Sequence, residues 1–159
     1  MATGFLHKAL KSVSILLLAM AAQMSLAVEG GQYKTADGMS VYVGVLPAEM
    51  LLGHPKGHHE REMHGGVPSG AKRHHVVVAL FETVSGKRIA DAKVEVGVSS
   101  IGMAASRTRA EPMLINGVTT YGAYVTLPSP GPYKIRVEIR RSEADKAVEV
   151  EFDYPLSRD

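Results

Sequence analysis

Apolar residues alternate with polar ones along most of the chain after residue 40, with the period of two that is typical of β-strands with one buried face. The clearest case is residues 133–140, where Tyr133, Ile135, Val137 and Ile139 alternate with charged side chains. The same alternation resumes at residues 148–154 after a short polar connection. We therefore expect these two segments to form an antiparallel hairpin.

Several other segments carry the same signature. Residues 75–81 are β-branched and nearly continuously apolar, as in a central strand, and Asn116-Gly117 is a strong hairpin signal between 113–115 and 118–125. Alternating valines mark two more strands, at 41–45 and 94–98, and a short strand is expected near 32–34. No amphipathic helix of useful length interrupts this pattern. The sequence predicts an all-β fold, an Ig-like antiparallel β-sandwich of about seven or eight strands.

The first 27 residues have the features of a secretory signal peptide. Lys8 and Lys11 precede an apolar run at 15–22, and Ser25-Leu26-Ala27 provides small residues at a cleavage site. The run is shorter than the roughly 20 residues that a membrane-spanning helix needs. We expect a cleavable signal peptide at 1–27, a single mature domain at 28–159 that does not span the membrane, and a periplasmic location.

Removal of this segment changes the charge of the protein. Lys8 and Lys11 are its only charged residues, so of the 18 Lys and Arg in the chain 16 remain, against 16 Asp and Glu. A formally neutral domain lacks the basic excess of a nucleic-acid-binding protein. The chain has no Cys, which excludes disulfides and thiolate ligands, and it has no Trp, which argues against a carbohydrate-binding sandwich.

Residues 47–73 break the strand pattern and are rich in His, Pro and Gly. Six of the seven histidines lie between residues 54 and 75. Neutral imidazole is the commonest protein ligand for transition metals, and the thioether of a neighbouring Met adds a preference for Cu(I). A solvated His-rich loop that binds divalent metals weakly is the alternative. The polar candidates in and beside this loop are His54, His58, His59, Glu60, Glu62, Met63, His64, His74 and His75.

The chain shows no signature of a catalytic site. His59 and His64 frame a His-Glu-x-x-x-His segment, which is one residue longer than the zinc-protease motif and flanked by helix-breaking Gly and Pro. There is no nucleophile elbow, no phosphate-binding glycine loop and no paired-carboxylate signal. We therefore expect a protein that is not an enzyme.

Several short strings, in order, resemble the periplasmic iron- and copper-binding family that accompanies high-affinity iron permeases. They include an acidic-Met pair at Glu49-Met50, a turn at Ser85-Gly86-Lys87, a Pro-Met pair at 112–113, Tyr-Gly-Ala at 121–123, and the segments 131–134 and 150–154. The resemblance spans most of the mature chain. It implies an Ig-like fold, a copper ion as ligand with iron as the second candidate, and a role in metal uptake.

The resemblance also implies ligands. It assigns a copper-binding role to Met113 and a place in the site to Glu49, whereas the family's ligating His falls on Thr120, which cannot replace imidazole. The family's histidine-bearing insertion between its last two strands is absent here. We therefore expect the His-rich loop to supply the missing donors. The predicted mixed set is His64, His75, Met63 and Met113, with His74, His59 and Glu49 as further candidates.

The function hypothesis from sequence is a non-catalytic periplasmic metal carrier or accessory factor for copper, or alternatively iron. Its expected partners are the ion and either an inner-membrane metal transporter or another periplasmic metalloprotein, and a homodimer is compatible with the sequence. The alternative is an Ig-like protein-interaction or assembly domain that presents an edge strand, with an incidental His-rich loop.

Overall fold

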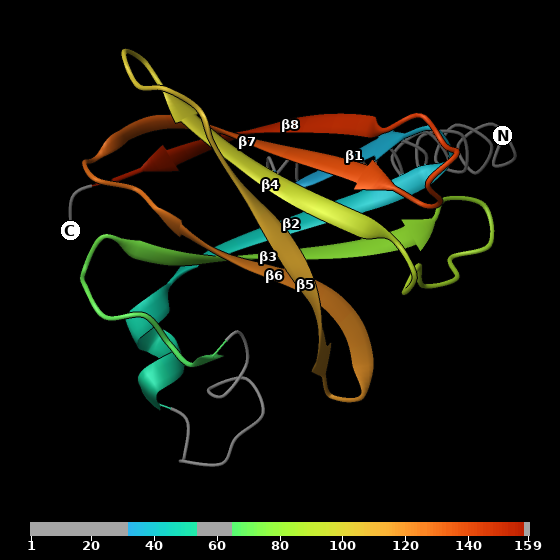
Figure 1. Cartoon of the computed structure of the whole chain (residues 1–159), viewed down its shortest axis with the longest axis horizontal. Helices are drawn as coiled ribbons and strands as arrows, with labels where there is room; N and C mark the ends of the chain where they lie inside the picture. The colour runs from blue at the N-terminus through green and yellow to red at the C-terminus, as the bar shows by residue number, and fades with distance from the viewer. Residues whose placement is uncertain (1–31, 54–64, 158–159) are drawn as a thin grey trace, which may run out of the picture.

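The computed structural model describes residues 32–53 and 65–157. The strands in chain order are β1 (Tyr33–Ala36), β2 (Met39–Pro47), β3 (Arg73–Glu82), β4 (Lys93–Ser100), β5 (Ser106–Ile115), β6 (Val118–Thr126), β7 (Gly131–Arg140) and β8 (Val148–Leu156). A short 3-10 helix, η2 (Ala48–Gly53), follows β2 (Figure 1). The all-β fold with eight strands confirms the sequence prediction. Within the described ranges no helix is long and apolar enough to cross a membrane.

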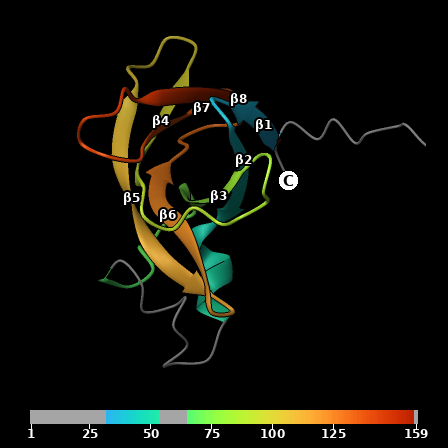
Figure 2. The same ribbon diagram turned by 90° about the vertical axis from the view of Figure 1, so that its right-hand side faces the viewer.

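All strand pairs are antiparallel, and the sheet order is β1-β2-β3-β6-β5-β4-β7-β8. The strands curl around a common core (Figure 2). At the two ends of this order, β1 and β8 lie side by side, and the Lys34 ammonium of β1 sits 5.7 Å from the ring centroid of Phe152 on β8. The sandwich is therefore one continuous sheet, bent into a nearly closed barrel.

Strand β5 makes the bend between the two halves of the sheet. Its residues 106–110 pair with β4, whereas its residues 111–115 pair with β6. The hairpin from β5 to β6 turns at Asn116 and Gly117, both with positive φ (50° and 76°), as the sequence predicted. The predicted final hairpin is also present, because β7 pairs with β8 along nine residues, from Gly131–Leu156 to Ile139–Val148.

The core consists of the inward-facing positions of both halves. Along β3 these are Val76, Val78 and Leu80, all completely buried, and across the barrel β7 contributes Ile135 and Val137. Strand alternation explains this arrangement, because every second side chain of a strand points to the same face. The phase of each strand therefore decides which polar residues face inward and which face outward.

The sequence prediction placed a His-rich loop at 47–73. In the structure Pro47 ends β2, residues 48–53 form η2, and β3 begins at Arg73. Helix η2 contacts β2 and β3, and its Ala48 and Leu51 are buried although they do not belong to the main core. Residues 54–64 lie outside the described residues, as do 1–31 with the predicted signal peptide.

Candidate metal centre

The two adjacent histidines at the start of β3 face opposite sides of the sheet. His74 is in phase with Val76 and Val78 and points into the open end of the barrel, whereas His75 is in phase with the outward-facing Val77. Both are buried, at 5% and 2% exposure. Two side chains on opposite faces of one strand cannot bind the same ion, so the structure separates these two predicted ligands.

His74 has the hydrogen bond that a metal-binding histidine requires. Its Nδ1–H donates to the backbone carbonyl of Lys72 at 3.3 Å, since a carbonyl can only accept. In the neutral ring this fixes the proton on Nδ1 and leaves the lone pair of Nε2 available to a metal ion.

Glu49 of η2 lines the same hollow as His74, at the end of the barrel between η2, the β6–β7 connection and the end of β8. The hollow has a volume of about 650 Å³, and Lys72, Ser129 and Tyr154 also line it. Two predicted ligands thus share one hollow. Their donors are one nitrogen and one carboxylate, a pair that suits Cu(II) or iron better than Cu(I).

Met113 lies on β5 with its side chain on the outer face of the sheet. It is only 3% exposed, yet it is not a member of the main core, and its register partner on β6 is Thr120. The Thr120 hydroxyl donates to the Met113 carbonyl at 3.4 Å. A buried thioether therefore lies beside the position at which the resemblance expects a ligating histidine.

His75 shares the outer face with Met113 but lies in a different row. It pairs with Leu46 of β2 and Tyr124 of β6, and its ring packs on the Tyr124 ring at 4.8 Å between centroids. Met113 pairs with Thr120 of β6, and the register of β6 with β3 places Ala79 of β3 opposite Thr120. Ala79 is four residues beyond His75, so Met113 and His75 lie about 13 Å apart along the strand direction and about 10 Å apart across the strands. The register therefore does not place Met113 and His75 side by side.

The remaining predicted ligands, His59, Met63 and His64, lie outside the described residues. Within 32–53 and 65–157, no three His, Asp or Glu side chains gather as a metal site. Sequence reasoning missed two residues beside the candidates, namely Lys72, which accepts the His74 hydrogen bond, and Tyr124, which stacks on His75. Lys72 is only two residues from His74 in the sequence, so proximity along the chain could have indicated its contact. Tyr124 is distant in the sequence and is brought to His75 only by the pairing of β3 with β6.

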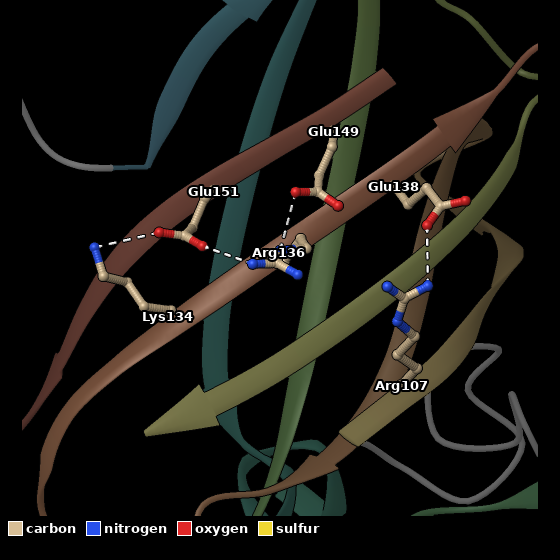
Figure 3. A network of polar contacts seen from close by, with 6 residues as sticks. All are labelled: Arg107, Lys134, Arg136, Glu138, Glu149 and Glu151. Carbon is tan, nitrogen blue, oxygen red and sulfur yellow. Dashed lines mark hydrogen bonds and ion pairs between the residues drawn. The ribbon is translucent and has the colours of Figure 1, made fainter. Parts of the chain in front are cut away.

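The outer face of β4, β5, β7 and β8 has a different character, because it carries alternating charges that pair with one another (Figure 3). Arg136 contacts Glu149 at 3.1 Å and Glu151 at 3.2 Å, and Arg107 contacts Glu138 at 3.2 Å. These exposed pairs form a solvated surface, and each is worth little in stability. On the opposite outer face, across β2, β3, β6 and residues 111–115 of β5, the positions in phase with His75 and Met113 are mostly uncharged, and Arg73 and Glu111 are the exceptions.

That contrast follows from the register. The outward positions of β3 and β6 near the candidates are Val77, Ala79, Thr120 and Gly122, and Glu111 of β5 is the one acidic residue in those rows. A soft ligand on such a face has few charged competitors. We therefore distinguish two candidate positions, the outer-face position at Met113 and the hollow position at Glu49 and His74.

Three solved structures share this fold. FetP of uropathogenic Escherichia coli, isolated after expression in the periplasm, matches with 16% identity and a TM-score of 0.60 over 79% of this chain and 92% of FetP. Copper-reconstituted P19 of Campylobacter jejuni matches with 13% identity and a TM-score of 0.59 over 79% and 92%. A DUF4426 family protein of Pseudomonas aeruginosa PAO1 matches with 12% identity and a TM-score of 0.59 over 80% and 98%.

Copper-bound variants of both FetP and P19 also match this chain. No family model matches the sequence, and no curated protein matches it significantly. At these identities the likeness concerns the backbone. The described chain therefore has the fold found in copper-bound FetP and P19.

Proposed function

We propose that the protein is a periplasmic copper-binding protein that acts as a non-catalytic carrier or accessory factor in metal uptake or homeostasis, with iron as the second candidate metal. The observation that carries this proposal is the fold shared with copper-bound FetP and P19 over about four fifths of the chain. Fold alone does not assign function. The donor chemistry at the two candidate positions supplies the second argument.

The first donor is the thioether of Met113. A methionine in a strand is usually a core residue, and Met39, which is equally buried, is one. Met113 differs because it is buried on the outer face, outside the main core. A thioether is a soft ligand that selects Cu(I), so we assign Cu(I) binding to Met113, with the loop residues His59, Met63 and His64 as the further proposed donors. His75 is left out of this set, because the register holds it away from Met113.

The second pair of donors is Glu49 and His74 in the hollow. The Nδ1–H of His74 is engaged by the Lys72 carbonyl, so its Nε2 is the free donor, and the Glu49 carboxylate lines the same hollow. Nitrogen and oxygen donors suit Cu(II) or iron. We propose that this pair favours the oxidised ion, and that a carrier with distinct soft and hard positions can hold copper in both oxidation states.

The proposed periplasmic location supports the binding of a soft metal ion by His and Met side chains. The predicted signal peptide directs the chain to an oxidising compartment, where thiolate ligands are prone to form disulfides. The chain contains no Cys, so His and Met side chains are its only soft or borderline donors.

The experiment is a competitive titration of the exported protein, purified from a periplasmic extract, with Cu(I), Cu(II) and Fe(II). Met113→Leu keeps the size and burial of the side chain and removes the sulfur. We expect it to weaken Cu(I) binding by at least about tenfold and to leave Cu(II) binding unchanged, because loss of a residue that only supports a metal ligand already costs about 10–100-fold in metal affinity. Glu49→Gln and His74→Gln should show the opposite pattern.

Met39→Leu is the matched control. Met39 is also 3% exposed, but it belongs to the core cluster, so its replacement should leave all copper affinities unchanged. Both Leu variants should remain folded, because volume-conserving apolar exchanges cost less than about 1.5 kcal/mol. The site assignment is wrong if Met113→Leu and His74→Gln both bind Cu(I) and Cu(II) like the wild type.

A further inference from the structure

The barrel opens at one corner because β5 changes its partner. Residues 106–110 of β5 pair with β4, and the pairing of β5 with β6 begins only at Glu111. Figure 1 shows β5 turning away from β6 toward the β4–β5 turn. Strand β6 meanwhile stays paired with β3 as far as Thr126. The two halves of the sheet therefore separate between the first half of β5 and the end of β6.

The phase of β5 shows that this corner is open toward the interior. Ala110 of β5 belongs to the core and is 2% exposed. Thr108 and Ser106 have the same phase and so point inward too, yet both are exposed. Their partners on β4, Val96 and Val98, are buried. Exposed hydroxyl side chains at inward positions indicate that no side chain of the described residues fills the space beside them.

A pocket of about 480 Å³ occupies this space, and we call it the β4–β5 pocket. Val98 of β4, Val125 of β6 and Tyr133 of β7 line it and belong to the core. Met103, in the turn between β4 and β5, also lines it and is 48% exposed. The volume falls in the range of about 300–1,000 Å³ that is typical of small-molecule sites. The apolar lining favours a ligand with an apolar body.

Arg73, at the start of β3, is the charged residue that lines this pocket. A guanidinium has five N–H donors. Within the described residues Arg73 forms no ion pair, its Nη1 donates to the Thr126 hydroxyl at 2.8 Å, and its Nε has no hydrogen-bond partner. A guanidinium pairs best with a carboxylate or a phosphate. A single cation balances a single negative charge, which favours a carboxylate over a phosphate dianion.

We propose that the β4–β5 pocket binds a small monocarboxylate with an apolar body, of the size of a medium-chain fatty acid. The carboxylate pairs with Arg73, and the apolar body covers Val98 and Val125 and extends past Met103. Burial of the apolar body supplies affinity, and the guanidinium selects the charged end.

This site does not depend on copper binding. Among the described residues Pro128 alone lines both the β4–β5 pocket and the hollow of Glu49 and His74. Met113 does not line the β4–β5 pocket. The pocket is therefore tested on the exported protein without added copper.

Calorimetric titration with octanoate at neutral pH measures the affinity. A ligand with about ten non-hydrogen atoms and moderate efficiency should bind with a Kd of about 0.1–1 mM. Octanamide has the same shape without the charge and should bind at least about tenfold more weakly. Hexanoate should also bind about tenfold more weakly, because each buried methylene contributes about three- to fourfold. A parallel titration with 2-naphthoate distinguishes a ring from a chain as the preferred apolar body.

Two measurements connect the affinity to Arg73 and the pocket. In NMR of the protein labelled at the methionine methyl groups, octanoate should shift the Met103 signal and leave that of Met39, in the core, in place. Arg73→Gln should weaken binding at least about tenfold, and Arg73→Lys, which keeps the charge but loses the planar fork, should weaken it less. Arg109→Gln, at an exposed position of β5 outside the pocket, should leave the affinity unchanged.

A further variant probes the apolar part, because Arg73→Gln also removes the hydrogen bond to Thr126. Thr108→Phe places a ring in the pocket from an exposed strand position, where an aromatic residue is well tolerated. It should weaken octanoate binding at least about tenfold. Val84→Phe, at a fully exposed residue outside the pocket, should not change it.

Three results would overturn the proposal. The first is that neither octanoate nor 2-naphthoate binds at about 5 mM. The second is equal affinity of the wild type and Arg73→Gln, or of octanoate and octanamide, because the carboxylate is then not recognised. The third is octanoate binding that neither shifts the Met103 signal nor weakens in Thr108→Phe, because the ligand then lies elsewhere.

Discussion

The hydroxyl of Tyr121 is expected to hold the connection between the two halves of the barrel. Tyr121 lies on β6 and is 1% exposed. Its hydroxyl accepts a hydrogen bond from the Ala92 backbone N–H at 2.9 Å and donates one to the Ile89 carbonyl at 3.3 Å. Both partners belong to the segment that crosses from β3 to β4. Burial raises the pKa of the Tyr121 hydroxyl, so it keeps the proton that it donates.

Replacement of Tyr121 by Phe keeps the ring and removes only the hydroxyl. A typical hydrogen bond contributes about 0.5–1.5 kcal/mol net, and a buried group left without a partner costs about 1–3 kcal/mol. Two bonds disappear, and the Ala92 N–H and Ile89 carbonyl lose a partner. We therefore expect Tyr121→Phe to lower the free energy of unfolding by about 2 kcal/mol.

Equilibrium urea unfolding measures this change. With the urea dependence typical of a domain of this size, about 1–3 kcal/mol per M, the midpoint should fall by about 1 M at unchanged slope. Tyr42→Phe is the control, because Tyr42 is 45% exposed on the outer face, and it should stay within about 0.5 kcal/mol of the wild type. A Tyr121→Phe variant as stable as the Tyr42→Phe variant would refute the proposed role of the hydroxyl.

Two further predictions concern stability. Hydrogen bonds from Arg136 and Lys134 lower the pKa of Glu151, and one from Lys134 lowers the pKa of Asp153, from ordinary values of 4.5 and 3.8. The stabilisation by these ion pairs is therefore present above the ordinary pKa values and is lost as the pH falls through the lowered pKa values of the native protein. Urea midpoints should drop on acidification, and the drop should be smaller in Lys134→Met, which lacks the shared cation. A Lys134→Met variant with the same pH dependence as the wild type would contradict this role of the pairs. Asn116→Ala, at a position with φ of 50°, should cost about 1 kcal/mol in thermal unfolding, whereas an unchanged midpoint would contradict the strained-turn argument.

The strands were predictable because each carries its own pattern. Alternation at 133–140 and 148–154 identified β7 and β8, and Asn116-Gly117 identified the turn between β5 and β6, where both residues adopt positive φ. These signals are local. The order of the strands depends on contacts between distant segments, and the division of β5 between two neighbours has no local signature.

The candidate ligands show the same limit. The alternation that runs through Val76 and Val78 extends back to His74, so its inward direction was available from the sequence, together with the outward direction of His75. The separation of Met113 from His75 was not, because it follows from the order β3-β6-β5 and from the register of those strands. The contribution of His59, Met63 and His64 stays a prediction.

The copper assignment at Met113 is the central claim, and NMR of the exported protein labelled at the methionine methyl groups tests it most directly. Titration with Cu(I) under reducing conditions should shift the Met113 methyl signal in proportion to the first equivalent of copper, because coordination changes the electron density at the adjacent sulfur. The Met39 signal should stay in place, since that side chain belongs to the core. A Met113 signal that stays unchanged while one equivalent of Cu(I) binds tightly would contradict the account.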